Sequence, residues 1–200
     1  YVENAVYSVK LTVTDNNGAK SSITSSVTVL DRPPIASFTK SASTVLTAEI
    51  VRFNASASFD PDGFIVSYSW VFGDGTTATG MTPSHSYADN RVYNVTLTVT
   101  DNDGATASTS STVTVLNRPP VASFTDSAAT VYKGQTIYFN ASASYDPDGS
   151  IVSYFWTFGD GKNATGVTVN HGYEHYGNYT VTLTVTDDDG MSTSVSTVKS

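Results

Sequence analysis

The chain has 200 residues, of which 39% are hydrophobic and 14% charged, and its formal net charge is −8. This composition can supply packed cores and excludes a disordered tail, and the acidic balance argues against nucleic acid or an anionic membrane surface as a partner. The absence of cysteine excludes disulfide scaffolds and thiolate chemistry, and no apolar run is long enough to predict a membrane span in this segment.

A repeat of 86 residues sets the organisation of the chain. The motifs LTVTDNNG, LTVTDNDG and LTVTDDDG begin at Leu11, Leu97 and Leu183, with the same spacing each time. A unit of this length exceeds the repeats of solenoids, which cannot bury a core alone. It fits tandem self-contained domains.

Paired prolines mark the boundaries between these domains. The tripeptide RPP follows Asp31 and Asn117, again 86 residues apart, and two prolines stiffen a link and exclude a helix before them. We therefore predict that residues 1–30 are the C-terminal strands of a preceding domain. Residues 31–116 would form one whole domain, and residues 117–200 a second whose last strand is slightly short.

Residues 1–30 match residues 87–116, and alone they would leave two strands with open edges and apolar faces. Either the natural chain continues upstream, or these strands complete a neighbouring subunit by strand addition. The first interpretation is favoured, because Tyr1 opens inside a strand-like pattern and no signal peptide precedes it.

Alternating apolar residues predict short β-strands within each repeat, as in VRFNASAS and YNVTLTVTD. The residues that this alternation turns toward the core are, in the first stretch, Val51, Phe53, Ala55 and Ala57, and in the second, Tyr93, Val95, Leu97 and Val99. Gly, Asp and Pro punctuate the strands, and no amphipathic helical run is present. The sequence therefore predicts an all-β fold of tandem Ig-like β-sandwiches.

Three aromatic residues are assigned to the core. Trp70 and Trp156 would lie on the central strand of each domain, and Tyr93 occupies the place where Ig-like domains carry a tyrosine corner. A sugar-stacking platform would need exposed aromatic rings, whereas these three have inward parity. Packing is therefore the favoured interpretation.

The motifs of both repeats resemble one known family. RPPIASF, FDPDGFIVSYSWVFGDG and LTVTDNDG in the first repeat, and RPPVASF, YDPDGSIVSYFWTFGDG and LTVTDDDG in the second, closely resemble the PKD domain (polycystic kidney disease-type repeat). The resemblance implies PKD-type Ig-like sandwiches in extracellular parts of proteins and no catalysis. Asn54 and Asn140 depart from the family, which more often has aspartate there.

Acidic loops are expected to meet at one end of each domain. In an Ig-like sandwich the loop between the second and third strands, the last hairpin loop and the entering segment share that end. The oxygen-bearing residues that would meet are Asp31, Asp60, Asp62, Asp101 and Asp103 in the first domain, and Asn117, Asp146, Asp148, Asp187 and Asp189 in the second.

Two interpretations of these loops stay open. Calcium takes six to eight oxygen ligands from flexible carboxylates and carbonyls, and the resemblance implies calcium near the linker in some members of the family. Alternatively, Asp and Asn cap backbone turns while Gly supplies φ > 0. No other cofactor is expected.

Other chemistry is excluded or disfavoured. The FGDG sequences ending at Gly75 and Gly161 are followed by no helix, so they predict turns and not phosphate loops. Asp60 and Asp74 flank a whole strand, too far apart for a glycosidase pair. His85 and His171 recur in register, which suggests a structural hydrogen bond and disfavours zinc.

Five Asn-X-Ser/Thr sequons predict N-linked glycans if the host is archaeal or eukaryotic. Four of them have outward parity on strands, and the fifth follows a GDG turn. They lie at Asn54, Asn94, Asn140, Asn163 and Asn178.

The leading functional interpretation is a non-catalytic structural or adhesive region of a cell-surface, surface-layer or filament protein, forming a rod of Ig-like domains whose junctions calcium would stiffen. Its partners would be its own copies or neighbouring surface-protein subunits, and its location extracellular. The alternative is an accessory spacer or polymer-binding module of a secreted hydrolase. No constellation in the sequence supports an autonomous enzyme.

Overall fold

The computed structural model describes residues 4–200, and every regular element in that range is a β-strand. The first two strands, β1 (Ala5–Thr14) and β2 (Lys20–Val29), form an antiparallel sheet of their own. Large apolar side chains on this hairpin are exposed, including Leu11 at 61% and Ile23 at 69%. The core positions of this segment therefore lack the cover that their counterparts have in the first repeat.

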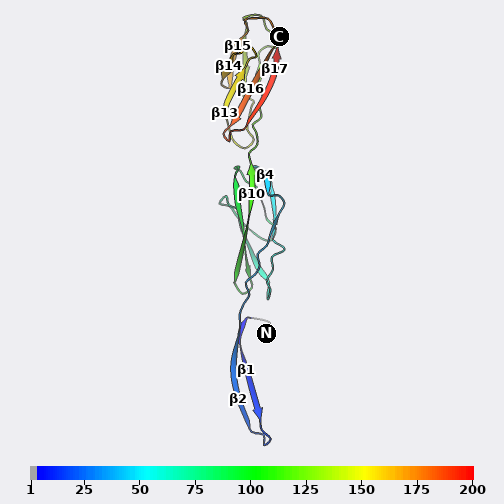
Figure 1. Ribbon diagram of the computed structural model, residues 1–200, viewed down its shortest axis with the longest axis vertical. Coiled ribbons are helices and arrows are strands. Elements are labelled where there is room, and N and C mark those ends of the chain that lie inside the picture. The colour runs from blue at the N-terminus through cyan, green and yellow to red at the C-terminus, as the bar shows by residue number, and fades with distance from the viewer. Residues whose placement is uncertain (1–3) are drawn as a thin grey trace. The chain divides into compact units, whose positions relative to one another are not determined.

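The first repeat folds into two sheets (Figure 1). The smaller sheet has the order β3-β5-β8 and consists of β3 (Thr39–Lys40), β5 (Val51–Asn54) and β8 (Ser84–His85). The larger has the order β4-β10-β9-β6-β7 and consists of β4 (Thr44–Leu46), β10 (Thr106–Leu116), β9 (Val92–Asp101), β6 (Ile65–Val71) and β7 (Thr77–Thr79).

The second repeat builds the same two-sheet arrangement. One sheet has the order β11-β12-β15 and consists of β11 (Thr125–Asp126), β12 (Thr136–Asn140) and β15 (Thr168–Gly172). The other has the order β14-β13-β16-β17 and consists of β14 (Asn163–Thr165), β13 (Ile151–Thr157), β16 (Tyr179–Asp187) and β17 (Ser192–Lys199).

The chain divides into two compact units whose borders differ from those of the repeats. The first unit holds the residues up to Ser43 together with Ile50–His85 and Val92–Thr114. The second holds Thr44–Glu49, Ser86–Arg91 and Val115–Ser200. Each acidic cluster predicted from the sequence falls within a single unit.

The predicted core tryptophans are fully buried. Trp70 and Trp156 are both 0% exposed, and their indole Nε1–H groups donate to the carbonyls of Gly80 at 2.8 Å and Gly166 at 2.9 Å. The inward residues of β9 are also buried, as the alternation predicts. Truncating such a buried ring to alanine typically costs about 3–5 kcal/mol of stability. The two tryptophans therefore serve the packing of the core.

The tyrosine corner is present. Tyr93 is 2% exposed, and its counterpart Tyr179 donates from its hydroxyl to the carbonyl of His175 at 3.0 Å. A hydroxyl that returns to the backbone a few residues upstream is the defining contact of this corner.

One predicted core position is wrong. Ala57 is exposed, because β5 ends at Asn54 and the chain then turns. The Asn54 Oδ1 accepts from the amide of Ser56 at 2.9 Å, which starts that turn. Ser58 takes the buried place, where its hydroxyl donates to the carbonyl of Ser37 at 2.8 Å.

Candidate metal centres

Three acidic segments of the first unit meet at one place. Asp31 lies in the entering segment, Asp60 in the loop between β5 and β6, and Asp101 at the end of β9. Partial burial raises the pKa of Asp31, and the charges of Asp101, Asp103, Asp62 and Asp60 raise it further. The loops thus approach each other closely enough for their charges to interact, as the sequence predicts.

Part of this arrangement is turn capping. Asp101 is 1% exposed, and its Oδ1 accepts from the amides of Asp103 at 3.0 Å and Ala105 at 2.8 Å. The Asn102 Oδ1 accepts from the amide of Phe64 at 2.8 Å, which ties the last hairpin to the neighbouring loop. These bonds fix the loops but use only one oxygen of Asp101.

The remaining carboxylate oxygens have no partner. Buried polar atoms are normally hydrogen-bonded, so those without a bond need an explanation. All such side-chain atoms in the described chain belong to residues of the two predicted clusters. In the first unit they are Asp31 Oδ1, both Oδ atoms of Asp60 and Asp101 Oδ2, and in the second Asn117 Oδ1, both Oδ atoms of Asp146 and Asp148 Oδ1.

The second cluster repeats the first with one carboxylate replaced by an amide. Asn117 stands where the first repeat has Asp31, and its Nδ2–H donates to Asp187 Oδ2 at 2.9 Å. The amide of Arg118 donates to Asp148 Oδ2 at 2.9 Å. The amide substitution satisfies an oxygen of Asp187 that stays without a partner in its counterpart Asp101.

The two clusters hold carboxylates whose pKa is raised above the ordinary value. Burial is the largest cause of the raised pKa of Asp60, and the charges of Asp62 and Asp101 add to it. The pKa of Asp146 is raised by burial and by neighbouring charges in the same way. Each cluster therefore concentrates negative charge at partly buried positions.

Calcium fits this donor set, because it accepts six to eight oxygens and prefers carboxylates. Bound at a cluster, it would satisfy the unpartnered oxygens and cancel the repulsion. In residues 4–200, however, no three acidic or histidine side chains already stand in a ready ligand arrangement. Binding would require the carboxylates to draw together.

Four predicted ligands have no atom among the buried oxygens without a partner, namely Asp62, Asp103, Asp187 and Asp189. Asp103 is exposed and accepts from the Asn102 side-chain amide at 3.0 Å, although its charge reaches Asp31. Asp189 is exposed, and it is Asp188 whose Oδ1 accepts from the amide of Ser150 at 2.8 Å. The alternation of β16 places Asp187 inward, where it is 1% exposed, but the strand ends before Asp188 and Asp189.

The two GDG turns hold a histidine. The Nε2 of His85 lies 2.6 Å from Asp74 Oδ2, and that of His171 lies 2.9 Å from Asp160 Oδ2. The His85 ring stacks on Phe72 with centroids 4.2 Å apart. These contacts confirm the structural hydrogen bond predicted for the two histidines.

The five sequon asparagines are all exposed in the structure. Asn54 and Asn140 use their Oδ1 atoms to accept from the amides of Ser56 and Ser142, each at 2.9 Å. Exposure makes glycan attachment sterically feasible at each of them, and occupancy stays a prediction.

Comparison with known proteins decides the family. A sequence profile described as the PKD domain matches residues 31–116 and 117–200. The chain belongs to the PKD domain family. PKD domains are Ig-like modules without catalytic function, so the chain consists of non-catalytic modules.

Several relatives of this PKD pair are large proteins. The chain is 39% identical over 138 residues to the pre-pro-metalloprotease PrtV of Vibrio cholerae, covering 69% of the chain and 15% of the protease. It is 45% identical over 67 residues to a microbial collagenase of Vibrio alginolyticus, covering 34% of the chain and 8% of the collagenase. It is 31% identical over 209 residues to the mouse dyslexia-associated protein KIAA0319-like protein, covering 93% of the chain and 20% of that protein.

Among solved structures, the PKD1 domain of Vibrio anguillarum Epp is similar to one PKD domain of this chain. It shares 38% sequence identity, covers 43% of this chain and 96% of its own length, and has a TM-score of 0.39. The chain spans no more than a fifth of the curated relatives named above. In residues 4–200, no helix has the length and apolar character to cross a membrane.

Proposed function

We propose that this PKD pair is a non-catalytic, extracellular accessory module of a hydrolase, and that it binds calcium at the two acidic clusters. The likeness to a metalloprotease and a collagenase supports the accessory role. None of the relatives named above is a surface-layer or filament protein. The accessory interpretation therefore takes precedence over the rod that the sequence favoured.

The observation that carries the calcium proposal is the set of eight buried oxygens without a partner, four in each unit. Turn capping alone leaves these atoms unexplained, because the backbone bonds at Asp101 and Asp148 use their other oxygens, and both oxygens of Asp60 and of Asp146 have no partner. A divalent cation would give each of them a partner. It would also hold the entering segment against the body of its own domain.

The residues that would hold the ion are Asp31, Asp60 and Asp101 in the first domain, with Asp62 and Asp103 completing the shell. In the second domain they are Asn117, Asp146, Asp148 and Asp187, and Asp189 lies further out. The direct test is isothermal titration of the chelator-treated chain with calcium. Binding of two ions per chain is expected, and the absence of binding heat at millimolar calcium would refute the proposal.

The accessory role needs a different test. Peptide sequencing and intact-mass measurement of the protein isolated from its source would show what else the same polypeptide contains. A hydrolase domain in that polypeptide supports the accessory role. A polypeptide made only of further PKD repeats would instead support the structural rod and its self-association.

A further inference from the structure

The second PKD domain has a hollow against strands β12 and β15. It is lined by Tyr138, Phe139, Thr168, Val169 and Asn170. The hollow has about 380 Å³ of room, which falls in the range of small-ligand sites, about 300–1,000 Å³. Phe139 is 1% exposed and belongs to the core, whereas Tyr138 is 63% exposed. Tyr138 is therefore the large aromatic side chain that this hollow offers to a ligand.

A glycosylation sequon lies beside this hollow. Asn140 begins the sequence Asn-Ala-Ser and follows Tyr138 by two residues on β12, so strand alternation places both side chains on the outward face. In the antiparallel pairing of β12 with β15, Asn140 lies opposite Thr168, and Tyr138 lies opposite Asn170. Directly opposite residues have Cβ atoms about 4.5–5.5 Å apart. Asn140 therefore lies at the margin of the hollow.

The side-chain amide of Asn140 is free to carry a sugar. Its Oδ1 accepts from the amide of Ser142 at 2.9 Å. Its Nδ2, the atom to which an N-linked glycan is attached, makes no hydrogen bond within residues 4–200. The residues opposite Asn140 on the two neighbouring strands are Thr125 and Thr168, whose side chains are small. Attachment of a sugar therefore breaks no contact of this turn.

The first repeat has the same sequon without the aromatic ring. Asn54 also begins Asn-Ala-Ser, and its Oδ1 accepts from the amide of Ser56 at 2.9 Å. Arg52, however, stands where the second repeat has Tyr138. The neighbouring strand β8 has two residues, whereas β15 has five. The fold does not require the ring, and Asn54 provides an internal control.

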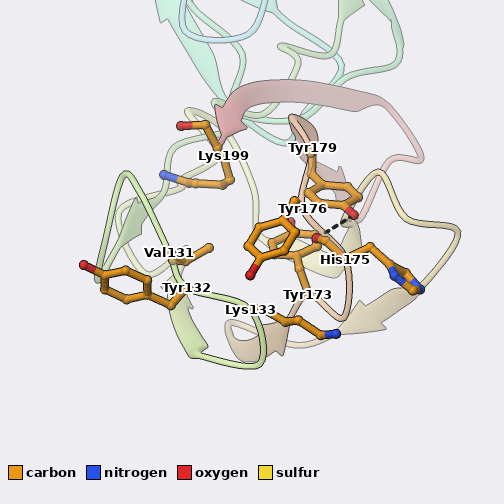
Figure 2. Close-up of a pocket in the computed structure, with 10 residues that line it drawn as sticks. Val131, Tyr132, Lys133, Tyr173, His175, Tyr176, Tyr179 and Lys199 are labelled. Carbon is orange, nitrogen blue, oxygen red and sulfur yellow. Dashed lines mark hydrogen bonds between the residues drawn. The ribbon is translucent and has the colours of Figure 1, made fainter.

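Another tyrosine near a sequon does not meet the same conditions. Tyr176 precedes Asn178 by two residues, but β16 begins only at Tyr179, so no strand alternation places the two side chains on one face. Figure 2 shows a separate hollow at which Tyr173, Tyr176 and Tyr179 gather. It has room for about 40 Å³, which is enough for a few water molecules and too little for a sugar ring.

We propose that the first N-acetylglucosamine of a glycan on Asn140 packs on the Tyr138 ring and occupies the hollow between β12 and β15. The C–H bonds on one face of the sugar lie against the negative face of the aromatic ring. Its polar edge can bond to the side chains of Thr168 and Asn170. Packing removes apolar surface of Tyr138 from water, so the glycan stabilises the second domain. The inference rests on N-glycosylation and is independent of the calcium clusters and of the accessory role.

The test is the melting temperature of the full chain secreted from yeast, with each glycan trimmed enzymatically to one N-acetylglucosamine. Ser142→Ala removes the sequon and keeps the bond to Asn140, which uses the backbone amide of residue 142. The second domain of the parent should melt about 4 °C or more above that of Ser142→Ala. This gain should vanish in the Tyr138→Ala background. Ser56→Ala, the matched control, removes the first-repeat sequon and should leave the gain unchanged.

A spectroscopic signature separates packing from a general effect of the glycan. Protons above an aromatic ring shift upfield, so the C–H signals of the sugar on Asn140 should lie upfield of those on Asn54 and return in Tyr138→Ala. Equal signals at both sites, a gain that survives Tyr138→Ala, or an unmodified Asn140 in the secreted chain would overturn the inference. Self-association of the unglycosylated chain that Tyr138→Ala abolishes would also overturn it and assign the hollow to a second copy.

Discussion

Asp101 brings together the two interpretations of the acidic loops at a single residue. Its Oδ1 caps the last hairpin through two backbone amides, whereas its Oδ2 is buried without a partner. Capping and ion binding are therefore compatible, since they use different oxygens. A substitution that keeps the caps and removes one charge can separate them.

Asp60→Asn is that substitution. Both oxygens of Asp60 lack a partner and its pKa is raised by burial and like charges. In excess chelator the variant should melt a few degrees higher than the parent, because it relieves repulsion. In millimolar calcium it should melt lower, because a ligand is lost. Melting curves in both buffers check this, and a shift of the same sign in both would point to turn capping alone.

Asp74 gives the chain a defined acid sensitivity. Burial opposes its charged form, but hydrogen bonds from Thr76 and His85 outweigh burial and lower its pKa from 3.8 to about 2. A carboxylate with a depressed pKa stabilises the fold above its unfolded pKa. That contribution should be lost as pH falls from about 4 through about 2.

The measurement is urea unfolding of the parent and of Asp74→Asn between pH 5 and pH 2, in chelator. The difference in unfolding free energy should be largest at pH 5 and shrink toward zero at pH 2. Taking the difference between parent and variant removes the contribution of the acidic clusters to the free energy of unfolding. Their raised pKa values change stability with pH in the opposite direction. A difference that does not change with pH would contradict the assignment of Asp74.

At the scale of the element, the GDG turn is fixed by the close approach of two backbones. Gly73 and Gly75 both have positive φ, at 89° and 91°. A Cβ on Gly73 would lie 2.8 Å from the carbonyl oxygen of Asn94, whereas a Cβ on Gly75 would meet nothing within 4 Å. The turn therefore offers a matched pair of glycines that share the strain and differ in the contact.

Gly75→Ala should cost only the left-handed backbone penalty, about 1–2 kcal/mol. Gly73→Ala should cost clearly more, because β9 cannot move aside without breaking its pairing with β6. Thermal melts of the two variants check this, with about 4–8 °C expected per kcal/mol for a domain of this size. Equal losses of stability in the two variants would show that the backbone at Asn94 moves aside at little cost in free energy.

Much of the sheet structure could be predicted, because alternation over long strands such as β9 leaves only one inward face. Strand ends could not. Ala57 keeps the parity of β5 but falls in the turn after Asn54, where the hydroxyl of Ser58 finds a backbone partner. A side-chain hydrogen bond across 21 residues leaves no trace in a local pattern.

The candidate sites also include features that the sequence could predict and features that it could not. The acidic clusters could be predicted because the connectivity of the fold brings their loops together. The exposure of Tyr132 and Tyr176 could not be predicted, because both lie in irregular segments where no period marks them as exposed. The signal available in the sequence was the difference between repeats, Leu46 against Tyr132 and Asn90 against Tyr176.

At the scale of the whole molecule, the sequons predict a glycoprotein in a suitable host. All five asparagines are exposed, so enzymatic removal of N-glycans from the native protein should lower its mass. Glycopeptide mapping should locate the sugars. Asn163, which closes the GDG turn of the second repeat, is expected to accept a glycan without loss of stability. A natural protein from such a host with no modified sequon would contradict this prediction.

The two domains should differ in calcium affinity. The first cluster has five carboxylates, whereas the second replaces Asp31 by Asn117, whose amide group already bonds Asp187. More ligand charge favours calcium, so the first domain is expected to bind the tighter ion. Titration of Asp60→Asn and Asp146→Asn separately should remove the tighter and the weaker event, respectively. The reverse assignment would contradict the ranking.

The most direct test of the account is the melting temperature of the chain in chelator and in calcium. At calcium 100-fold above the dissociation constant, binding stabilises a domain by about 2.7 kcal/mol, which corresponds to an increase of about 10 °C or more. The double variant Asp60→Asn with Asp146→Asn should lose most of that increase, and magnesium should give little of it. Identical melting curves with calcium and chelator would contradict the assignment of the partnerless oxygens to a metal.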